Sequence, residues 1–136
     1  MSKATDEVVA IERGFWTTAT DPGYFEHNMA DESLSVIEPL GFVEKAQAVA
    51  WPAEAPWQNV EMLDLIAREI GPDCVILAYH GRAELDGAGK PYQGSIASTY
   101  CRIDGQWQLV LTSHQPWIPR DLSDRADEEP ATRTAG

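Results

Sequence analysis

Apolar and polar residues alternate along two neighbouring segments, 92–103 and 106–116, on either side of an Asp104-Gly105 pair. Alternation with a period of two is typical of a half-buried β-strand. An Asp-Gly pair adopts the positive φ angles of a type I′ turn, which matches the twist of paired antiparallel strands. The sequence therefore predicts a hairpin, and a third strand over 74–85, rich in β-branched and aromatic residues, extends it to a meander.

The first half of the chain has helical spacing instead. Apolar residues recur every three or four positions over 5–19, which predicts an amphipathic helix. Asp21 followed by Pro22 is typical of a helix N-cap and first helical position, and predicts a second helix that ends near residue 29. The remaining predicted elements of this half are a short strand over 34–39 and a helix over 42–51.

Segment 59–70 is harder to assign from its residues alone. Most of them are good helix formers, and an apolar set would share one helical face: Val60, Leu63, Ala67 and Ile70. Local propensity therefore favours a helix, and a strand is the alternative.

Length and composition indicate one globular domain, expected over 1–120, because the chain has 136 residues of which 43% are apolar. Segment 121–136 has one leucine and no aromatic residue, so we expect a disordered acidic tail. No apolar run is long enough to cross a bilayer, and the first residues lack the hydrophobic segment of a secretory signal, so we expect a cytoplasmic location. A net charge of −12 argues against nucleic-acid and membrane partners, because it repels phosphate groups and anionic lipids.

The turn at Asp104-Gly105 also sets cross-strand partners in the meander, provided that neither strand bulges. The bulkier residues then share one face, which we expect to be concave and packed against the helices: Val75, Leu77, Tyr79, Ile96, Ser98, Tyr100, Trp107, Leu109 and Leu111. The outer face holds smaller residues, among them Ile76, Ala78, Ala97 and Val110. Because these are too apolar to be left in water, we expect a homodimer that forms through the outer face.

The same register places His80, Ser95 and His114 in one row on the outer face. A serine–histidine pair or a two-histidine metal site is conceivable, but there is no third ligand and no strained turn, so hydrogen bonding at an interface is favoured. Cys74 faces Cys101 on this face, and we expect both to remain thiols. We expect neither a metal site nor a cofactor.

The order of two helices, a short strand, a third helix and a curved meander resembles the nuclear transport factor 2-like (NTF2-like), or cystatin-like cone, superfamily and its SnoaL-like branch. The stretches that carry the resemblance are YFEHNMADE, VIEPLG, VILAYHGRA, ASTY and DGQWQLV, which together span most of 7–116. The resemblance implies an α+β fold in which a curved antiparallel sheet wraps around N-terminal helices and leaves a pocket at the open end of a cone. It also implies that 59–70 is a strand, and we follow it there.

VIEPLG is similar to the segment that carries the catalytic carboxylate of ketosteroid isomerases in this superfamily, and the matching residue is Glu38. The resemblance implies a general base in a partly dry pocket, where burial raises the pKa of a carboxyl. Glutamate is one methylene longer than the aspartate of that pattern. The tyrosine of the first helix and the acid of a later strand, which stabilise the enolate oxygen in those enzymes, have no match here.

Other side chains could supply the missing donors. Tyr79 and Tyr100 on the concave face are the first candidates, expected to share a cavity with Glu38, and the indole N–H of Trp16 is a third. His27, one turn from Tyr24, is a candidate acid or base. The remaining candidate ligand contacts are Tyr24, Trp51, Trp57, Ser98 and Trp107, of which Trp51 and Trp57 flank a proline-rich loop over the pocket mouth.

Two functions follow from the resemblance. One is a cofactor-independent isomerase, cyclase or dehydratase that acts by proton transfer on a small apolar carbonyl compound. The other is a non-catalytic ligand-binding or dimerisation module, which the same fold supports.

Overall fold

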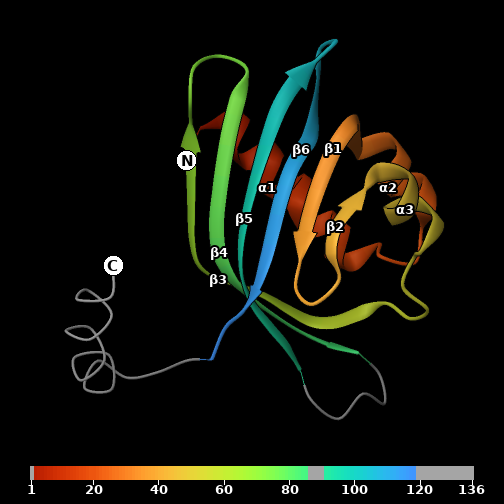
Figure 1. The fold of residues 1–136 in the computed structure, drawn as a ribbon. Helices are drawn as coiled ribbons and strands as arrows, with labels where there is room; N and C mark the ends of the chain where they lie inside the picture. Colours follow the sequence, from red (N-terminus) through yellow and green to blue (C-terminus); the bar gives the residue numbers. More distant parts are fainter. Residues whose placement is uncertain (1, 86–90, 119–136) are drawn as a thin grey trace, which may run out of the picture.

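A computed structural model describes residues 2–85 and 91–118, which form three helices and a six-stranded sheet. In chain order the elements are α1 (Lys3–Thr17), α2 (Pro22–Asn28), β1 (Met29–Ile37), β2 (Gly41–Glu44), α3 (Lys45–Ala50), β3 (Trp57–Glu69), β4 (Cys74–Leu85), β5 (Tyr92–Ile103) and β6 (Gln106–Pro116). The strand order is β2-β1-β6-β5-β4-β3, and only the β1–β6 pair is parallel. Figure 1 shows the helices gathered against one side of a curved sheet, which confirms the expected α+β fold.

Both N-terminal helices begin where the sequence predicts, within two residues. The side chain of Ser2 caps α1 by accepting from the Thr5 backbone N–H, and Asp21 caps α2 by accepting from the N–H of Gly23. The buried face of α1 consists of Thr5, Val8, Glu12 and Trp16, spaced three or four residues apart. A glutamate therefore lies on the face of α1 that packs against the sheet.

The predicted helix over 42–51 is wrong at its beginning. Residues 41–44 form the edge strand β2, in which Val43 is buried and Phe42 is 80% exposed, so apolar character alternates there as in a strand. Strand β2 pairs with β1, where Val36 lies opposite Phe42. Backbone pairing therefore overrides helical spacing as far as Glu44, and only Lys45–Ala50 is helical.

Segment 59–70 lies almost wholly within strand β3, so the propensity argument for a helix fails and the strand is confirmed. β3 pairs with β4 along most of its length, and two irregularities in the register interrupt the pairing. Asn59 and Asp64 lie within these irregularities with φ angles of 52° and 55°, a region that Asn and Asp tolerate better than most residues.

A β-bulge in the β5–β6 pair changes which side chains face the helices. Tyr100 lies opposite Leu109 as predicted, but Thr99 lies opposite Leu111, so Val110 is the extra residue on β6. Beyond the bulge every β6 side chain points to the face opposite to the one predicted. Leu111, predicted to be concave, is 43% exposed, whereas Thr112 is buried.

The main core lies between α1 and the concave face of the sheet. Its buried cluster contains Val8, Met29, Val75, Leu77, Tyr100, Trp107 and Leu109. The predicted concave face is thus confirmed for its β4 and β5 residues and for β6 as far as the bulge. No helix in the described ranges has the length and apolar character needed to span a bilayer. Segment 121–136, where a disordered tail is expected, lies outside the described residues.

Candidate functional site

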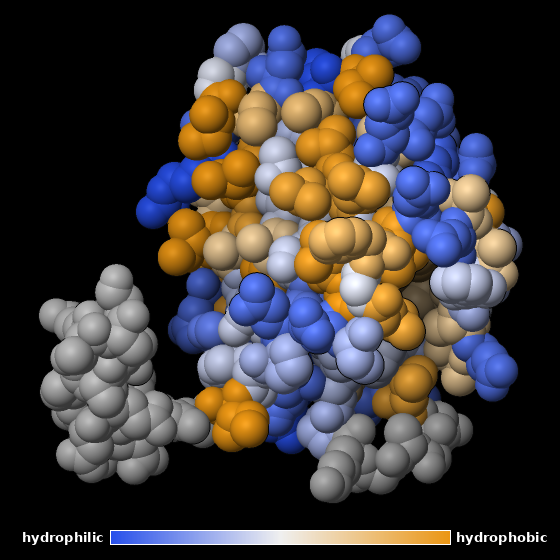
Figure 2. Space-filling view, in the orientation of Figure 1, coloured by the Kyte–Doolittle hydropathy of each residue, from blue (hydrophilic) through white to orange (hydrophobic). Residues whose placement is uncertain are grey.

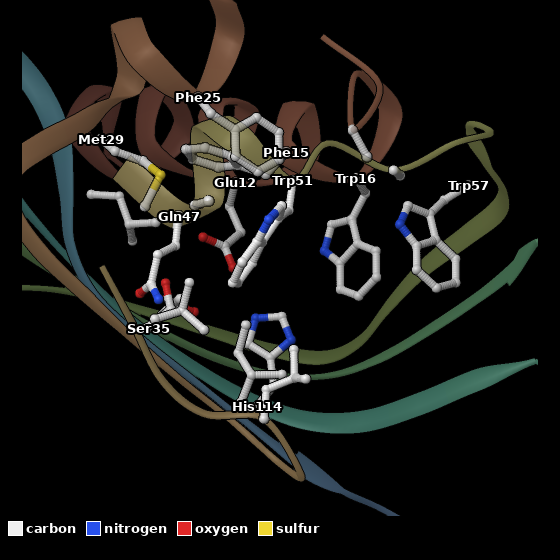
Figure 3. Close-up of a pocket in the computed structure, with 18 of the residues that line it drawn as sticks. Glu12, Phe15, Trp16, Phe25, Met29, Ser35, Gln47, Trp51, Trp57 and His114 are labelled. Atoms are coloured by element: carbon white, nitrogen blue, oxygen red, sulfur yellow. The ribbon is translucent and has the colours of Figure 1, made fainter. Parts of the chain in front are cut away.

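A pocket of about 360 Å³ opens between the helices and the concave face of the sheet. This volume is within the range of small-molecule sites. Its walls are mainly apolar and aromatic: Phe15, Trp16, Ala19, Phe25, Met29, Ile37, Leu40, Val43, Ala48, Trp51, Ala53, Trp57, Tyr92 and Leu109. The other lining residues are Glu12, Ser35, Gln47, Thr112 and His114. Figure 3 shows Glu12 and His114 entering this space from opposite sides, on α1 and β6.

Glu12 is the acidic residue of the pocket wall, and it is only 4% exposed. Three hydroxyl groups hold its carboxyl group. Tyr79 and Ser98 donate to Oε2 at 2.6 and 2.9 Å, and Tyr100 donates to Oε1 at 2.5 Å. None of the ion pairs formed by residues 2–85 and 91–118 involves Glu12. Hydroxyl donors therefore replace the water that a buried carboxylate loses.

Burial raises the pKa of Glu12 above its ordinary value of 4.5, because a desolvated carboxylate loses hydration, and the three hydroxyl donors only partly oppose this shift. Burial and the adjacent Glu12 charge also raise the pKa of Tyr79 and Tyr100. Both phenols therefore remain protonated and available as donors. The site therefore contains a carboxyl that holds its proton to a higher pH than a solvated glutamate does, and three hydroxyls that are hydrogen-bonded to it.

Aromatic contacts extend this network along the pocket wall. Trp16 Nε1 donates to the Tyr79 hydroxyl at 3.0 Å, so the indole orients the phenol that in turn donates to Glu12. The Trp16 ring packs against Trp57 and Tyr92 with centroid separations of 5.6 and 5.7 Å. The packing of these rings against one another fixes the position of the apolar wall.

His114 faces the pocket because of the bulge at Val110, so the predicted row of His80, Ser95 and His114 on the outer face is wrong. His114 lies opposite Ile96, whereas Ser95 lies opposite Gln115. Its Nδ1 is 3.1 Å from the Tyr92 hydroxyl. Desolvation lowers the pKa of His114 to about 4, so its imidazole is neutral at pH 7.

The other two members of the row do meet on the outer face. His80 Nδ1 is 3.0 Å from Ser95 Oγ, and the His80 ring stacks on Trp117 at 4.0 Å. Cys74 lies opposite Cys101, and both are free thiols. In the described ranges no cluster of three His, Cys, Asp or Glu side chains could hold a metal ion.

Glu38 does not share a cavity with Tyr79 and Tyr100, contrary to the prediction. β1 ends at Ile37, and its inward side chains in this region are Ser35 and Ile37 rather than Val36 and Glu38. Glu38 is exposed and is not part of the pocket wall. The two tyrosines are buried, and their hydroxyls are bound to Glu12.

The other predicted contacts are divided between the pocket and its surroundings. Trp16, Trp51 and Trp57 line the pocket, and Trp51 is 66% exposed at its rim. Ser98 does not line the pocket, but its hydroxyl donates to Glu12, which does. The remaining three lie elsewhere: Tyr24 donates to the Ile11 carbonyl, His27 is exposed on α2, and Trp107 is buried in the core with the Arg102 guanidinium over its ring.

No family model matches the sequence. No curated protein matches it either. Solved structures do match, at identities low enough that the likeness concerns the fold alone. An NTF2-like protein from Cytophaga hutchinsonii is 20% identical, with a TM-score of 0.71 over 86% of this chain and 100% of that one. A candidate ketosteroid isomerase from Parabacteroides distasonis is 17% identical, with a TM-score of 0.69 over 86% and 90% of the two chains.

A third similar structure is the calcium/calmodulin-dependent kinase II hub homology domain of the alga Chlamydomonas reinhardtii. It is 19% identical, with a TM-score of 0.64 over 87% of this chain and 100% of that one. The chain therefore has the fold of the NTF2-like superfamily, as the motifs in its sequence indicate. Within that fold, the buried Glu12 and the apolar pocket around it are the features that point to a function.

Proposed function

We propose that this protein binds a small, uncharged, mainly apolar carbonyl compound in the pocket and moves a proton on it through Glu12. The observation that carries the proposal is the burial of an ionisable carboxyl in the wall of an apolar pocket, held by hydroxyls instead of a cation. A buried carboxyl whose pKa is raised above that of a solvated glutamate is a stronger base once ionised, which favours proton transfer. In this proposal Glu12 has the general-base role that the family resemblance implies for Glu38.

The hydrogen bonds indicate which carboxyl oxygen would react. Oε2 accepts from both Tyr79 and Ser98, whereas Oε1 accepts only from Tyr100 among the described residues and keeps a lone pair. In the proposed step Oε1 takes a proton from the carbon next to the ligand carbonyl. The C–H electron pair becomes a C=C bond, and the carbonyl π pair moves to the oxygen. In a ligand with a C=C bond between its β and γ carbons, the enolate oxygen pair re-forms the C=O bond as the proton returns from Oε1 to the γ carbon, and the C=C bond moves next to the carbonyl; this isomerisation needs no oxidant or reductant.

The pocket wall favours an uncharged ligand. No lysine or arginine is among its lining residues in the described ranges, so an anionic ligand would meet Glu12 without a compensating charge. The indole rings of Trp16, Trp51 and Trp57 offer flat apolar surfaces to a hydrocarbon skeleton. The similarity of the fold to that of a candidate ketosteroid isomerase agrees with this substrate class.

The test is deuterium incorporation into 2-tetralone, an uncharged bicyclic ketone with exchangeable protons beside its carbonyl. NMR in deuterated buffer should show exchange above the buffer rate with the native protein, and none above it with Glu12→Gln. The matched control is Glu7→Gln, which changes an exposed glutamate of the same helix and should retain exchange. Equal rates for the native protein, Glu12→Gln and buffer would contradict proton transfer at Glu12.

A second function, self-association, is favoured by the outer face of the sheet. Three large apolar residues there are 40 to 49% exposed, and exposed alanines lie among them: Ile66, Ile76, Leu111, Ala78 and Ala97. Figure 2 shows hydrophobic side chains gathered across this face. We propose that a second copy of the chain covers it, because contiguous apolar patches on a free monomer are costly. The similarity to a hub homology domain agrees with an assembly role for this fold.

A further inference from the structure

His114 is the second ionisable group of the pocket wall that we single out, after Glu12. Its position follows directly from the bulge at Val110. The bulge turns the β6 side chains beyond it inward, so that Thr112 and His114 both line the cavity. Figure 3 shows the His114 ring projecting from the sheet side, opposite the helix side from which Glu12 enters. A ligand that fills the cavity can therefore meet the carboxyl on one side and the imidazole on the other.

The contact with Tyr92 favours one of the two neutral tautomers of His114. Burial raises the pKa of Tyr92, so its hydroxyl keeps a proton that needs an acceptor. Within residues 2–85 and 91–118 the hydroxyl has one partner, His114 Nδ1, at 3.1 Å. A Tyr92 hydroxyl that donates to Nδ1 places the proton of the neutral ring on Nε2. This leaves an Nε2–H group as a donor next to the cavity.

The donors of the hydrogen-bond network around Glu12 are already engaged. Tyr79, Tyr100 and Ser98 donate to the Glu12 carboxyl, and Trp16 Nε1 donates to the Tyr79 hydroxyl. Because the Ser98 proton goes to Glu12, the 2.8 Å contact with Thr112 takes its proton from Thr112. Of the donors expected from the sequence to stabilise an enolate oxygen, none remains free for a ligand.

We propose that the Nε2–H of His114 donates a hydrogen bond to an oxygen of the ligand, so that the pocket selects uncharged compounds bearing a carbonyl group over hydrocarbons of the same shape. This assignment rests on the proposed function, in which Glu12 acts on the carbon beside that carbonyl. This N–H would donate to the carbonyl oxygen of the bound ligand. The hydrogen bond would become stronger during proton transfer, because negative charge then develops on that oxygen.

The experiment compares 2-tetralone with tetralin, the hydrocarbon of similar shape that lacks the carbonyl, with binding followed by tryptophan fluorescence. The native protein should bind 2-tetralone more tightly than tetralin. His114→Phe should weaken 2-tetralone binding about fivefold, as expected for one neutral hydrogen bond, and leave tetralin binding unchanged. His114→Gln, which restores an N–H donor, should recover part of the loss.

A second measurement needs no ligand. Imidazole ¹⁵N NMR of the native protein at pH 7 should show Nε2 protonated and Nδ1 unprotonated. A protonated Nδ1, or 2-tetralone binding no tighter than tetralin, would overturn the assignment of His114. Exchange of 2-tetralone protons that depends on Glu12 but not on His114 would overturn this inference alone. Tetralone binding that depends on His114, without catalysed exchange, would overturn the proposed function alone.

Discussion

The Tyr100 hydroxyl lies 2.5 Å from Glu12 Oε1, so a side chain in the middle of the sheet solvates a carboxyl group on the first helix. Tyr100 is fully buried and Glu12 nearly so, which means that neither can exchange this contact for water. The folded state therefore depends on the match between the two residues. It also keeps the carboxyl fixed at the pocket wall.

Tyr100→Phe should lower the free energy of unfolding by about 2 kcal/mol, because it removes a donor to a buried, ionisable acceptor. In Glu12→Gln the same substitution should cost less, since the neutral amide loses a weaker hydrogen bond. Urea unfolding of the two single variants and the double variant measures the coupling between these residues. Strictly additive effects would show that the contact contributes nothing.

Glu12 should give stability a characteristic pH dependence. Its pKa is raised in the folded state, so between 4.5 and that higher value the folded protein holds a proton that the unfolded chain has lost. Stability should therefore fall as pH rises through this window, by about 1.4 kcal/mol for each unit of the shift. Glu12→Gln should lack this fall in urea unfolding measured from pH 4 upwards. A native and a variant protein with parallel pH profiles would contradict the raised pKa.

His114 should give stability the opposite pH dependence, so that stability falls as the pH is lowered. Its pKa is lowered from 6.5 to about 4, so the unfolded chain takes up a proton first as the pH falls. The stability that it contributes is complete above pH 6.5 and should decline by about 2 kcal/mol between pH 7 and pH 5. His114→Gln should remove this component in unfolding measurements, and His27→Gln is the control for loss of an exposed imidazole. The same slope in both variants would speak against a desolvated, neutral His114.

Ala97→Asp should dissociate the proposed dimer, because it introduces a charge into the exposed apolar patch on β5. Ala10→Asp is the matched control, since it adds the same charge to an exposed position on α1. Sedimentation at micromolar concentration should show a dimer for the native chain and for Ala10→Asp, and a monomer for Ala97→Asp. A monomeric native protein would contradict self-association through this face.

Particular residues show how far the sequence could predict this molecule. The Asp104-Gly105 turn fixes the hairpin register as far as Tyr100 and Leu109, so local chemistry suffices there. The bulge at Val110 carries no comparable signal, because valine is an ordinary strand residue. One additional residue in β6 was enough to move His114 from the outer face, where it was predicted, into the pocket.

Glu12 was missed for a different reason. Glutamate is usually solvent exposed, so its place four residues after Val8 and four before Trp16 does not by itself indicate burial. The sequence did contain a signal, namely the hydroxyls of Tyr79, Ser98 and Tyr100 on the predicted concave face. Three buried donors need acceptors, and a carboxylate on the facing helix meets that need. The family resemblance points to Glu38 instead, because it does not show where a strand ends.

Titration of the Glu12 carboxyl by ¹³C NMR tests the central claim most directly, because a carboxyl buried in the wall of an apolar pocket should hold its proton to a higher pH than a solvated glutamate. The resonance can be assigned by its absence in Glu12→Gln. We expect a pKa above the ordinary value of 4.5, and a further rise when 2-tetralone fills the pocket and excludes water from the carboxyl. A pKa at or below 4.5 that does not respond to 2-tetralone would contradict the account.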